Sequence, residues 1–364
     1  MRNLLILFLL TASASLWGQS SSIFDKMQGA EILDATLKTD LSQLLSAIEG
    51  DAEYQPAVFS FTAPNGEAFT INLKVKQRGK FRRTACDFPP IMLNFSAKEL
   101  TRMGLADYDK YKLVTHCSED LPVGNEKVLR EYLAYKLYQE LTPQSYRVQL
   151  VRIQYLDSSH RISGFTRYGI IIEDTDEMAS RIGGKECDDC FYALNGMLHH
   201  SSVNLHAMFQ YMIGNSDYSL PVLRNVKLVR SQRNNLLIPV GYDFDFSGLV
   251  EAPYAIPASH LGQFVVRQRI YLGTFTPDED MKQVVNLFFN KQDRILRLIQ
   301  QFKPLPARQR AEVKDYILSF YEQMEMLRRK DFQDAYRLIR QEHPNAIPDG
   351  GQKQDYVIRA SKGK

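Results

Sequence analysis

Two acidic segments in the second half of the chain contain the side chains best suited to chemistry. Asp217 follows an apolar helical pattern, and Asn225 comes eight positions later (225 minus 217). Asp243 and Asp245 follow the short apolar run 238–240, which is typical of a buried strand. Carboxylate and amide oxygens are hard ligands that suit Mg²⁺. Phosphoryl transfer needs such an array, in which one carboxylate orients or deprotonates the attacking hydroxyl while an Asn and another Asp hold the metal.

The same residue types also form turns. Asp217 and Asn225 could be turn formers, and Asp243 and Asp245 could cap or brace a loop. Their order along the chain is helix, Asp loop, Asn, strand and Asp, which is the order in the C-lobe of protein-kinase-like enzymes. We therefore carry both interpretations forward, a phosphoryl-transfer site and a purely structural pair of loops.

The elements that must position these residues differ between the two halves of the chain. In the first half, apolar and polar residues alternate, which predicts strands. The expected strands are 58–61, 69–76, 91–95, 111–116, 147–155 and 164–173. Apolar residues at helical spacing predict further elements. The expected helices are 31–48, 126–141, 203–213, one opening at 276, and 307–342.

This arrangement predicts an α+β fold of the two-lobed, protein-kinase-like class. Residues 19–175 would form a sheet-rich N-lobe, an antiparallel sheet with one packed helix, and 176–343 a mainly helical C-lobe that carries the candidate catalytic loop. Residues 1–18 have the charged start, short apolar run and small residues of a removable signal peptide, so we expect an exported protein, periplasmic or extracellular. Residues 344–364 contain too few apolar side chains to pack, and we expect a disordered tail.

Taken in order, several segments resemble the CotH family of secreted, atypical kinase-like proteins named after the spore coat, and in particular exported proteins of that type. The matching segments are the turn at Arg78-Gly79, the helical segment 128–135, the segment 170–176, the loop 215–217 and the segment 242–245. They extend from about residue 70 to residue 250, and no motif covers the helical C-terminal third.

The resemblance implies a role for each acidic residue. Asp217 would be the catalytic Asp, and Asn225 and Asp243 would bind the metal. Asp245 would be an auxiliary metal ligand. The separation between Asp217 and Asn225 is longer than in the usual kinase catalytic loop.

Cationic residues are expected to hold the phosphates of the nucleotide. Arg78 and Gly79 end a strand, as a turn that covers phosphates would. The loop that follows contains Arg82 and Arg83 but lacks the further Gly and Ser of a phosphate-covering loop. The guanidinium groups would contact phosphate in place of backbone amides, or form a surface patch for an acidic partner.

A lysine that anchors phosphate and pairs with a helical glutamate is also expected from the resemblance. Chain order favours Lys112 and Glu131, with Lys74 and Lys76 as alternatives. All three lysines could equally be solvated strand residues.

The resemblance implies an exported enzyme that uses ATP and Mg²⁺ to transfer a phosphoryl group to a hydroxyl on a protein substrate. The alternative is a secreted, pseudokinase-type binding or envelope-assembly protein without catalysis, which the altered loop after Gly79 favours. The formal net charge of +3 (45 minus 42) argues against a nucleic-acid partner. After the signal peptide, no apolar stretch is long enough to span a membrane.

The four cysteines are expected to form disulfides in an oxidising compartment. Cys86 and Cys117 would join two neighbouring strand-like segments. Cys187 and Cys190 have C-x-x-C spacing, which fits a tight disulfide, free thiols or half of a zinc site. The candidate nitrogen ligands for zinc are His116, His199 and His200, but the regular ligand spacing of a structural zinc site is missing.

Overall fold

The structure is a computed structural model that describes residues 20–46, 52–274 and 276–329. The predicted signal peptide, 1–18, and the predicted tail, 344–364, lie outside these residues. The last part of the helix predicted to reach residue 342 also lies outside them.

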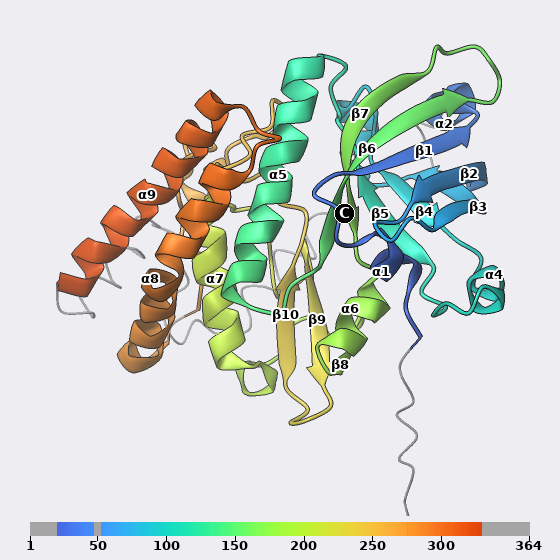
Figure 1. The fold of residues 1–364 in the computed structure, drawn as a ribbon. Coiled ribbons are helices and arrows are strands. Elements are labelled where there is room, and N and C mark those ends of the chain that lie inside the picture. The colour runs from blue at the N-terminus through green and yellow to red at the C-terminus, as the bar shows by residue number, and fades with distance from the viewer. Residues whose placement is uncertain (1–19, 47–51, 275, 330–364) are drawn as a thin grey trace, which may run out of the picture.

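Seven strands of the first half close into a barrel (Figure 1). Their order around the barrel is β1-β2-β3-β4-β5-β7-β6. The barrel closes because β1 pairs with β6 in parallel, whereas the other neighbouring strands pair antiparallel. The strands are β1 (Leu33–Thr39), β2 (Gln55–Thr62), β3 (Ala68–Gln77), β4 (Ile91–Asn94), β5 (Lys110–Val114), β6 (Val148–Asp157) and β7 (Phe165–Ile172).

Strand β1 overturns the helix predicted for 31–48. Leu33, Ala35 and Leu37 are buried in the barrel core, and the residues between them are more exposed, so burial alternates along the segment. The leucines fit a helical repeat as well as a strand, but only a strand can pair with β2 on one edge and with β6 on the other. Within the predicted range, the chain forms a helix only after this strand, in α2 (Leu41–Ser46).

The second half contains a small sheet as well as helices. The sheet has the order β10-β9-β8 and both its pairs are antiparallel. Its strands are β8 (Gly184–Glu186), β9 (Val226–Ser231) and β10 (Leu237–Gly241). In Figure 1 this sheet lies beside α6 (Thr175–Arg181) and below the helix α5 (Leu121–Leu141).

The predicted kinase-like fold class is therefore wrong. A closed mixed barrel takes the place of an antiparallel N-lobe sheet, and the second half combines helices with the three-stranded sheet instead of forming a mainly helical lobe. The alternation of apolar residues predicts strands correctly but does not encode which strands pair. Closure depends on the pairing of β1 with β6, which are far apart in the sequence.

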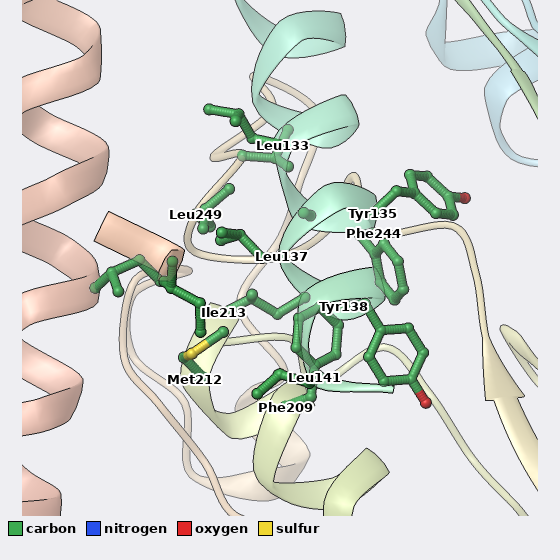
Figure 2. Close-up of a cluster of buried hydrophobic side chains, with 14 of the residues drawn as sticks. Leu133, Tyr135, Leu137, Tyr138, Leu141, Phe209, Met212, Ile213, Phe244 and Leu249 are labelled. Carbon is green, nitrogen blue, oxygen red and sulfur yellow. The ribbon is translucent and has the colours of Figure 1, made fainter. Parts of the chain in front are cut away.

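Helix α5 lies between the barrel and the helices of the second half (Figure 1). It contacts β6 and β7 on one side and α8 on the other, so most of its length is buried. Figure 2 shows Tyr138 beside Phe209, with ring centroids 4.3 Å apart, and Tyr135 beside Phe244, 4.7 Å apart. The contact of Tyr135 with Phe244 fixes the loop after β10 against α5, and the contact of Tyr138 with Phe209 fixes α7 against it.

The other helices of the barrel half are short, and those of the second half are long. They are α1 (Ile23–Met27), α3 (Arg82–Ala85), α4 (Ala97–Arg102), α7 (His200–Ile213), α8 (Asp278–Gln301) and α9 (Ala307–Arg329), with 3₁₀ turns at Asn195–Met197 and Ser259–Leu261. Among the described residues, no helix combines the length and the apolar composition needed to cross a membrane.

Two disulfides are formed. The predicted bond between Cys86 and Cys117 is confirmed, with the two Cα atoms 4.6 Å apart. Cys187 and Cys190 are also bonded to each other. Of the alternatives that their spacing left open, the structure therefore contains the disulfide. Disulfides are typical of proteins exported to an oxidising compartment.

Because β1 is a strand, lysine substitutions at two neighbouring positions should lower the free energy of unfolding by very different amounts. In the strand, Ala35 faces the barrel core and Thr36 lies on the outer face opposite Ser60. We expect Ala35→Lys to lower the free energy of unfolding by about 3 kcal/mol or more, because it buries an unpaired charge, and Thr36→Lys to change it by less than about 0.5 kcal/mol. Urea unfolding measures both. In the predicted helix Thr36 would lie on the apolar face, so the reverse order of effects would contradict the strand.

Candidate functional site

The loop after β10 places two carboxylates against α5. β10 ends at Gly241, and Asp243 then adopts the left-handed backbone conformation, with φ of +62°. Asp tolerates this conformation better than most residues because its short side chain can hydrogen-bond locally. The Asp243 backbone N–H donates to the Tyr135 hydroxyl at 2.8 Å. Phe244 is fully buried, so it anchors the loop between Asp243 and Asp245.

A buried arginine joins these carboxylates to the barrel. Arg82 opens the short helix α3 after β3, and only 6% of its surface is exposed. Its Nη2 atom lies 2.6 Å from Asp243 Oδ1, 2.6 Å from Asp245 Oδ2 and 3.9 Å from Glu131 Oε2. Burial by itself lowers the pKa of Arg82, but Asp243 and Asp245 hold it well above its usual range. The guanidinium therefore stays charged and bridges the two loops.

Three carboxylates surround this one guanidinium. Burial raises the pKa of Glu131 to about 8, against the opposing effect of Arg82. Burial also raises the pKa of Asp245, with Arg82 again opposing. Glu131 Oε1 has no hydrogen-bond partner within the described residues. Burial therefore favours the neutral, protonated form of Glu131, which limits the excess of negative charge.

Asp217 is held by its neighbours in the loop after α7. Asn225 Nδ2 donates to the Asp217 backbone oxygen at 2.7 Å and to Asp217 Oδ2 at 2.9 Å, and Arg224 Nε lies 3.4 Å from Asp217 Oδ1. Burial raises the pKa of Asp217, Arg224 opposes this, and the charges of Asp245 and Asp243 raise it further. Asp217 and Asn225 are thus in direct contact, and Asp217 experiences the charges of the other two acids.

Backbone hydrogen bonds connect the two acidic loops. Helix α7 ends at Gly214, whose φ of +66° is left-handed and where a Cβ atom would collide with the Tyr316 hydroxyl. The Gly248 N–H donates to the Gly214 oxygen at 3.0 Å, and the Leu249 N–H donates to the Ile213 oxygen at 3.0 Å. The loop that carries Asp217 and the loop that carries Asp243 therefore lie side by side.

Two cations, Lys112 and Arg78, act on Tyr242, the residue before Asp243. Lys112, in β5, donates from Nζ to Thr175 Oγ1 at 3.1 Å and lies 5.4 Å and 5.2 Å from the ring centroids of Tyr146 and Tyr242. Burial, together with the charge of Arg78, lowers the pKa of Lys112 to about 7. Among the described residues, neither Lys112 nor Arg78 forms an ion pair with a carboxylate.

Tyr242 connects the cationic side to the acidic side. It precedes Asp243 in the chain, and its ring lies beside Lys112. Burial raises the pKa of Tyr242, the charge of Asp243 raises it further, and the charge of Arg78 opposes this. Asp243 and Arg78 therefore act on the same tyrosine with opposite sign.

The structure gives Glu131 a cationic partner other than the expected lysine. Its ion pair is with Arg82, whereas Lys112 lies against tyrosine rings. Of the two alternatives, Lys74 is exposed on the barrel and Lys76 lies over another tyrosine ring. Chain order alone cannot distinguish these pairings, because they depend on how β3 and β5 face α5.

The turn at Arg78 and Gly79 is present, but the arginines that follow it differ in placement. Gly79 has a left-handed φ of +78° and leads into α3. Arg82, expected to contact phosphate or lie in a surface patch, is buried among carboxylates, while Arg83 is only partly buried. Sequence reasoning missed this role of Arg82 because two adjacent arginines look alike until the fold selects one.

The donor types of the acidic residues fit Mg²⁺. Asp217, Asp243 and Asp245 supply carboxylate oxygens, which are hard ligands. In the part of the chain that the structure describes, the ligand atoms of these three are not all within 4.8 Å of one another. Binding of one ion by all three would require their side chains to turn toward it. Arg82 would compete with that ion for Asp243 and Asp245.

Comparisons with known proteins add no relative. No protein-family model matches the chain, and no curated protein has a significantly similar sequence.

The low pKa of Lys112 predicts a pH dependence of stability. The pKa falls from 10.5 to about 7 on folding, so between these values the unfolded chain binds a proton that the folded chain does not. The free energy of unfolding should therefore rise with pH across this range. We expect Lys112→Met to reduce this rise and exposed Lys74→Met to leave it unchanged, as measured by urea unfolding at several pH values. Equal slopes in both variants would refute the shifted pKa.

Removal of Arg82 should leave buried carboxylates without their cation. We expect Arg82→Met to lower the free energy of unfolding by about 3–5 kcal/mol at neutral pH, and less at acidic pH where the carboxylates are protonated. Lys80→Met, in the same loop but exposed, is the control and should change it by less than about 0.5 kcal/mol. Chemical denaturation at neutral and acidic pH measures both. A loss for Arg82→Met that does not shrink at low pH would contradict the ionic role.

Proposed function

We propose that this protein is an exported phosphotransferase that moves a phosphoryl group from ATP to a hydroxyl, on a protein substrate, with Mg²⁺. The observation that carries the proposal is the juxtaposition of two kinds of charge. Asp217 experiences the charges of Asp243 and Asp245, and Asp243 directly follows Tyr242, whose ring centroid lies 5.2 Å from Lys112 Nζ. Lys112 and Arg78 have no carboxylate partner within 4.0 Å in the described residues. Phosphoryl transfer uses this combination, because it needs ligands for a metal and cations for phosphate oxygens.

The residues have distinct roles in this proposal. Asp217, held by Asn225, accepts the proton of the attacking hydroxyl or orients it. The raised pKa of Asp217, due mainly to burial, makes it a better proton acceptor than an exposed carboxylate. Lys112 and Arg78 bind the phosphates of the nucleotide, and phosphate oxygens favour the charged form of Lys112.

Asp243, Asp245 and the side-chain oxygen of Asn225 are the proposed ligands of Mg²⁺. The metal would neutralise the charge that develops on the phosphoryl oxygens. Tyr135 fixes the backbone of Asp243, and Phe244 fixes the loop in the core, so the Asp243 carboxylate is held on a rigid support. These contacts favour positioning, which is the main contribution of a protein to phosphoryl transfer.

A second candidate function keeps the site without catalysis. Arg82 already occupies one oxygen of Asp243 and one of Asp245, as a bound cation would. This contact favours a secreted binding or envelope-assembly protein in which the acidic cluster only joins the barrel to the second half. The two disulfides fit an oxidising exported compartment in either case.

A direct test measures binding and transfer with matched variants. The purified chain is titrated with ATP with and without Mg²⁺ by calorimetry, and label transfer from radiolabelled ATP to added protein substrates is then followed. We expect Asp217→Asn to lower transfer by about 100-fold or more while nucleotide binding persists, because it removes only the proton acceptor. Asp243→Asn should weaken Mg²⁺-dependent binding as well as transfer. Asp293→Asn, an exposed carboxylate on α8, is the control and should leave both unchanged.

The two candidates give different results in this assay. If ATP does not bind with or without Mg²⁺, the phosphotransferase proposal is wrong. If ATP binds but no label is transferred by the unmodified chain or by Asp217→Asn, the noncatalytic candidate is favoured.

A further inference from the structure

The Cys187–Cys190 disulfide lies outside the acidic site and has no role in the proposed phosphotransferase. It follows directly after β8, which ends at Glu186, and its two cysteines are only three positions apart. The Cys187 backbone N–H donates to the Leu228 oxygen at 2.8 Å, so the first cysteine is fixed to the small sheet. A short C-x-x-C ring on a rigid edge is a geometry used for thiol–disulfide chemistry.

A guanidinium lies against both sulfurs of this disulfide. Arg230 Nη2, on β9, lies 3.2 Å from Cys190 Sγ and 3.4 Å from Cys187 Sγ. A cation in this position stabilises the thiolate that forms when a disulfide is reduced. Asp189 Oδ1 lies 3.4 Å from Cys187 Sγ, and its negative charge disfavours a thiolate there. The charges therefore make Cys190 the better leaving group and Cys187 the sulfur that is attacked.

Three large apolar side chains are exposed beside this disulfide. Phe191, Tyr192 and Leu194, which follow Cys190 in the chain, each expose about half of their surface. Large exposed apolar side chains next to a reactive group mark a place where another chain can dock. The chemistry of this surface suits an apolar segment of a partner protein.

We propose that Cys187 and Cys190 form a thiol–disulfide exchange site that oxidises a pair of thiols in an apolar segment of a partner protein. A partner thiolate attacks Cys187 Sγ, the bond between Cys187 and Cys190 breaks, and Cys190 leaves as a thiolate beside Arg230. The second partner thiolate attacks the partner sulfur of the mixed disulfide and releases Cys187. The partner loses two electrons and two protons and becomes a disulfide, and the cysteine pair of this chain gains both and becomes a dithiol.

The other disulfide of the chain provides an internal reference. Cys117 is buried, and its backbone pairs with Phe88 at the side of the barrel. The bond closes a separation of 31 residues in the sequence. Because it ties distant segments together at the side of the barrel, we use Cys86–Cys117 as the structural reference bond.

The first experiment compares the two disulfides within the same molecules. The full chain is equilibrated in a series of glutathione buffers from oxidising to reducing, free thiols are alkylated, and peptides are counted by mass spectrometry. We expect Cys187–Cys190 to become reduced across this series while Cys86–Cys117 stays oxidised. A synthetic peptide of residues 184–194 is the control for C-x-x-C spacing alone. If the two disulfides of the chain respond alike, or the peptide is half-reduced in the same buffer as Cys187–Cys190 of the chain, the proposal is wrong.

The second experiment tests the charges around the sulfurs. In the Arg230→Gln variant, we expect half-reduction of Cys187–Cys190 to need a buffer with an about tenfold higher ratio of reduced to oxidised glutathione. The reason is that the thiolate loses a charged partner. Arg230→Lys should recover most of this change. Asp189→Asn, an exposed loop substitution, should act in the opposite direction by about threefold. Equal midpoints in all three variants and the unmodified chain would overturn the role of these charges.

The third experiment tests the docking surface. Synthetic dithiol peptides with Phe and Leu beside the cysteines are compared with peptides that carry Glu at those positions. We expect the oxidised chain to oxidise the apolar peptides about tenfold faster, and Phe191→Ser with Leu194→Ser to remove this preference without moving the glutathione midpoint. Equal rates for the two kinds of peptide would refute an apolar partner segment.

Discussion

The buried contact of Arg82 with Asp243 and Asp245 is the interaction on which the candidate site depends. It connects the loop after β3, in the barrel, to the loop after β10, in the second half of the chain. Burying charges is costly, and a buried ion pair often contributes little net stability compared with an apolar replacement. Its value here is in positioning, because a guanidinium between two carboxylates fixes the distance between the loops. The cluster contains more carboxylates than cations, and burial, with the charges of Asp245 and Asp243, raises the pKa of Glu131 against the opposing effect of Arg82.

Helix α5 converts this local contact into a rigid site. It supplies Glu131 to the ionic cluster and Tyr135 to the backbone of Asp243, one turn apart on the same face. Tyr138 packs on Phe209 of α7, so the helix also fixes the element that precedes Asp217 (Figure 2). A single helix between the barrel and the second half therefore positions acidic residues from both of the loops that contain them.

Local features could be predicted from the sequence, whereas features that depend on distant pairing could not. Alternating residues predicted β2 to β7, and apolar spacing predicted α5 and α7, because burial of one face leaves a period in the sequence. The prediction of a helix for 31–48 was wrong because the spacing of its leucines fits a strand as well as a helix. The strand forms because β1 pairs with β6, which is far along the chain. Within the site, Asp217 and Asn225 were expected to act together and do touch. The burial of Arg82 instead of Arg83 had no signal in the sequence.

The closed barrel is not a kinase-like fold, but function resides in a site and one chemistry occurs on many folds, so the charges of the site still bear on function. In this chain the small sheet positions residues of the candidate site. Val226, the first residue of β9, pairs with Gly241, the last residue of β10, so the residues just outside this pair meet at one edge. The Tyr242 N–H donates to the Asn225 oxygen at 3.1 Å there. Antiparallel pairing thus brings together Asn225 and the Tyr242–Asp243 turn, which are far apart along the chain, and β9 carries Arg230 to the disulfide at its other end.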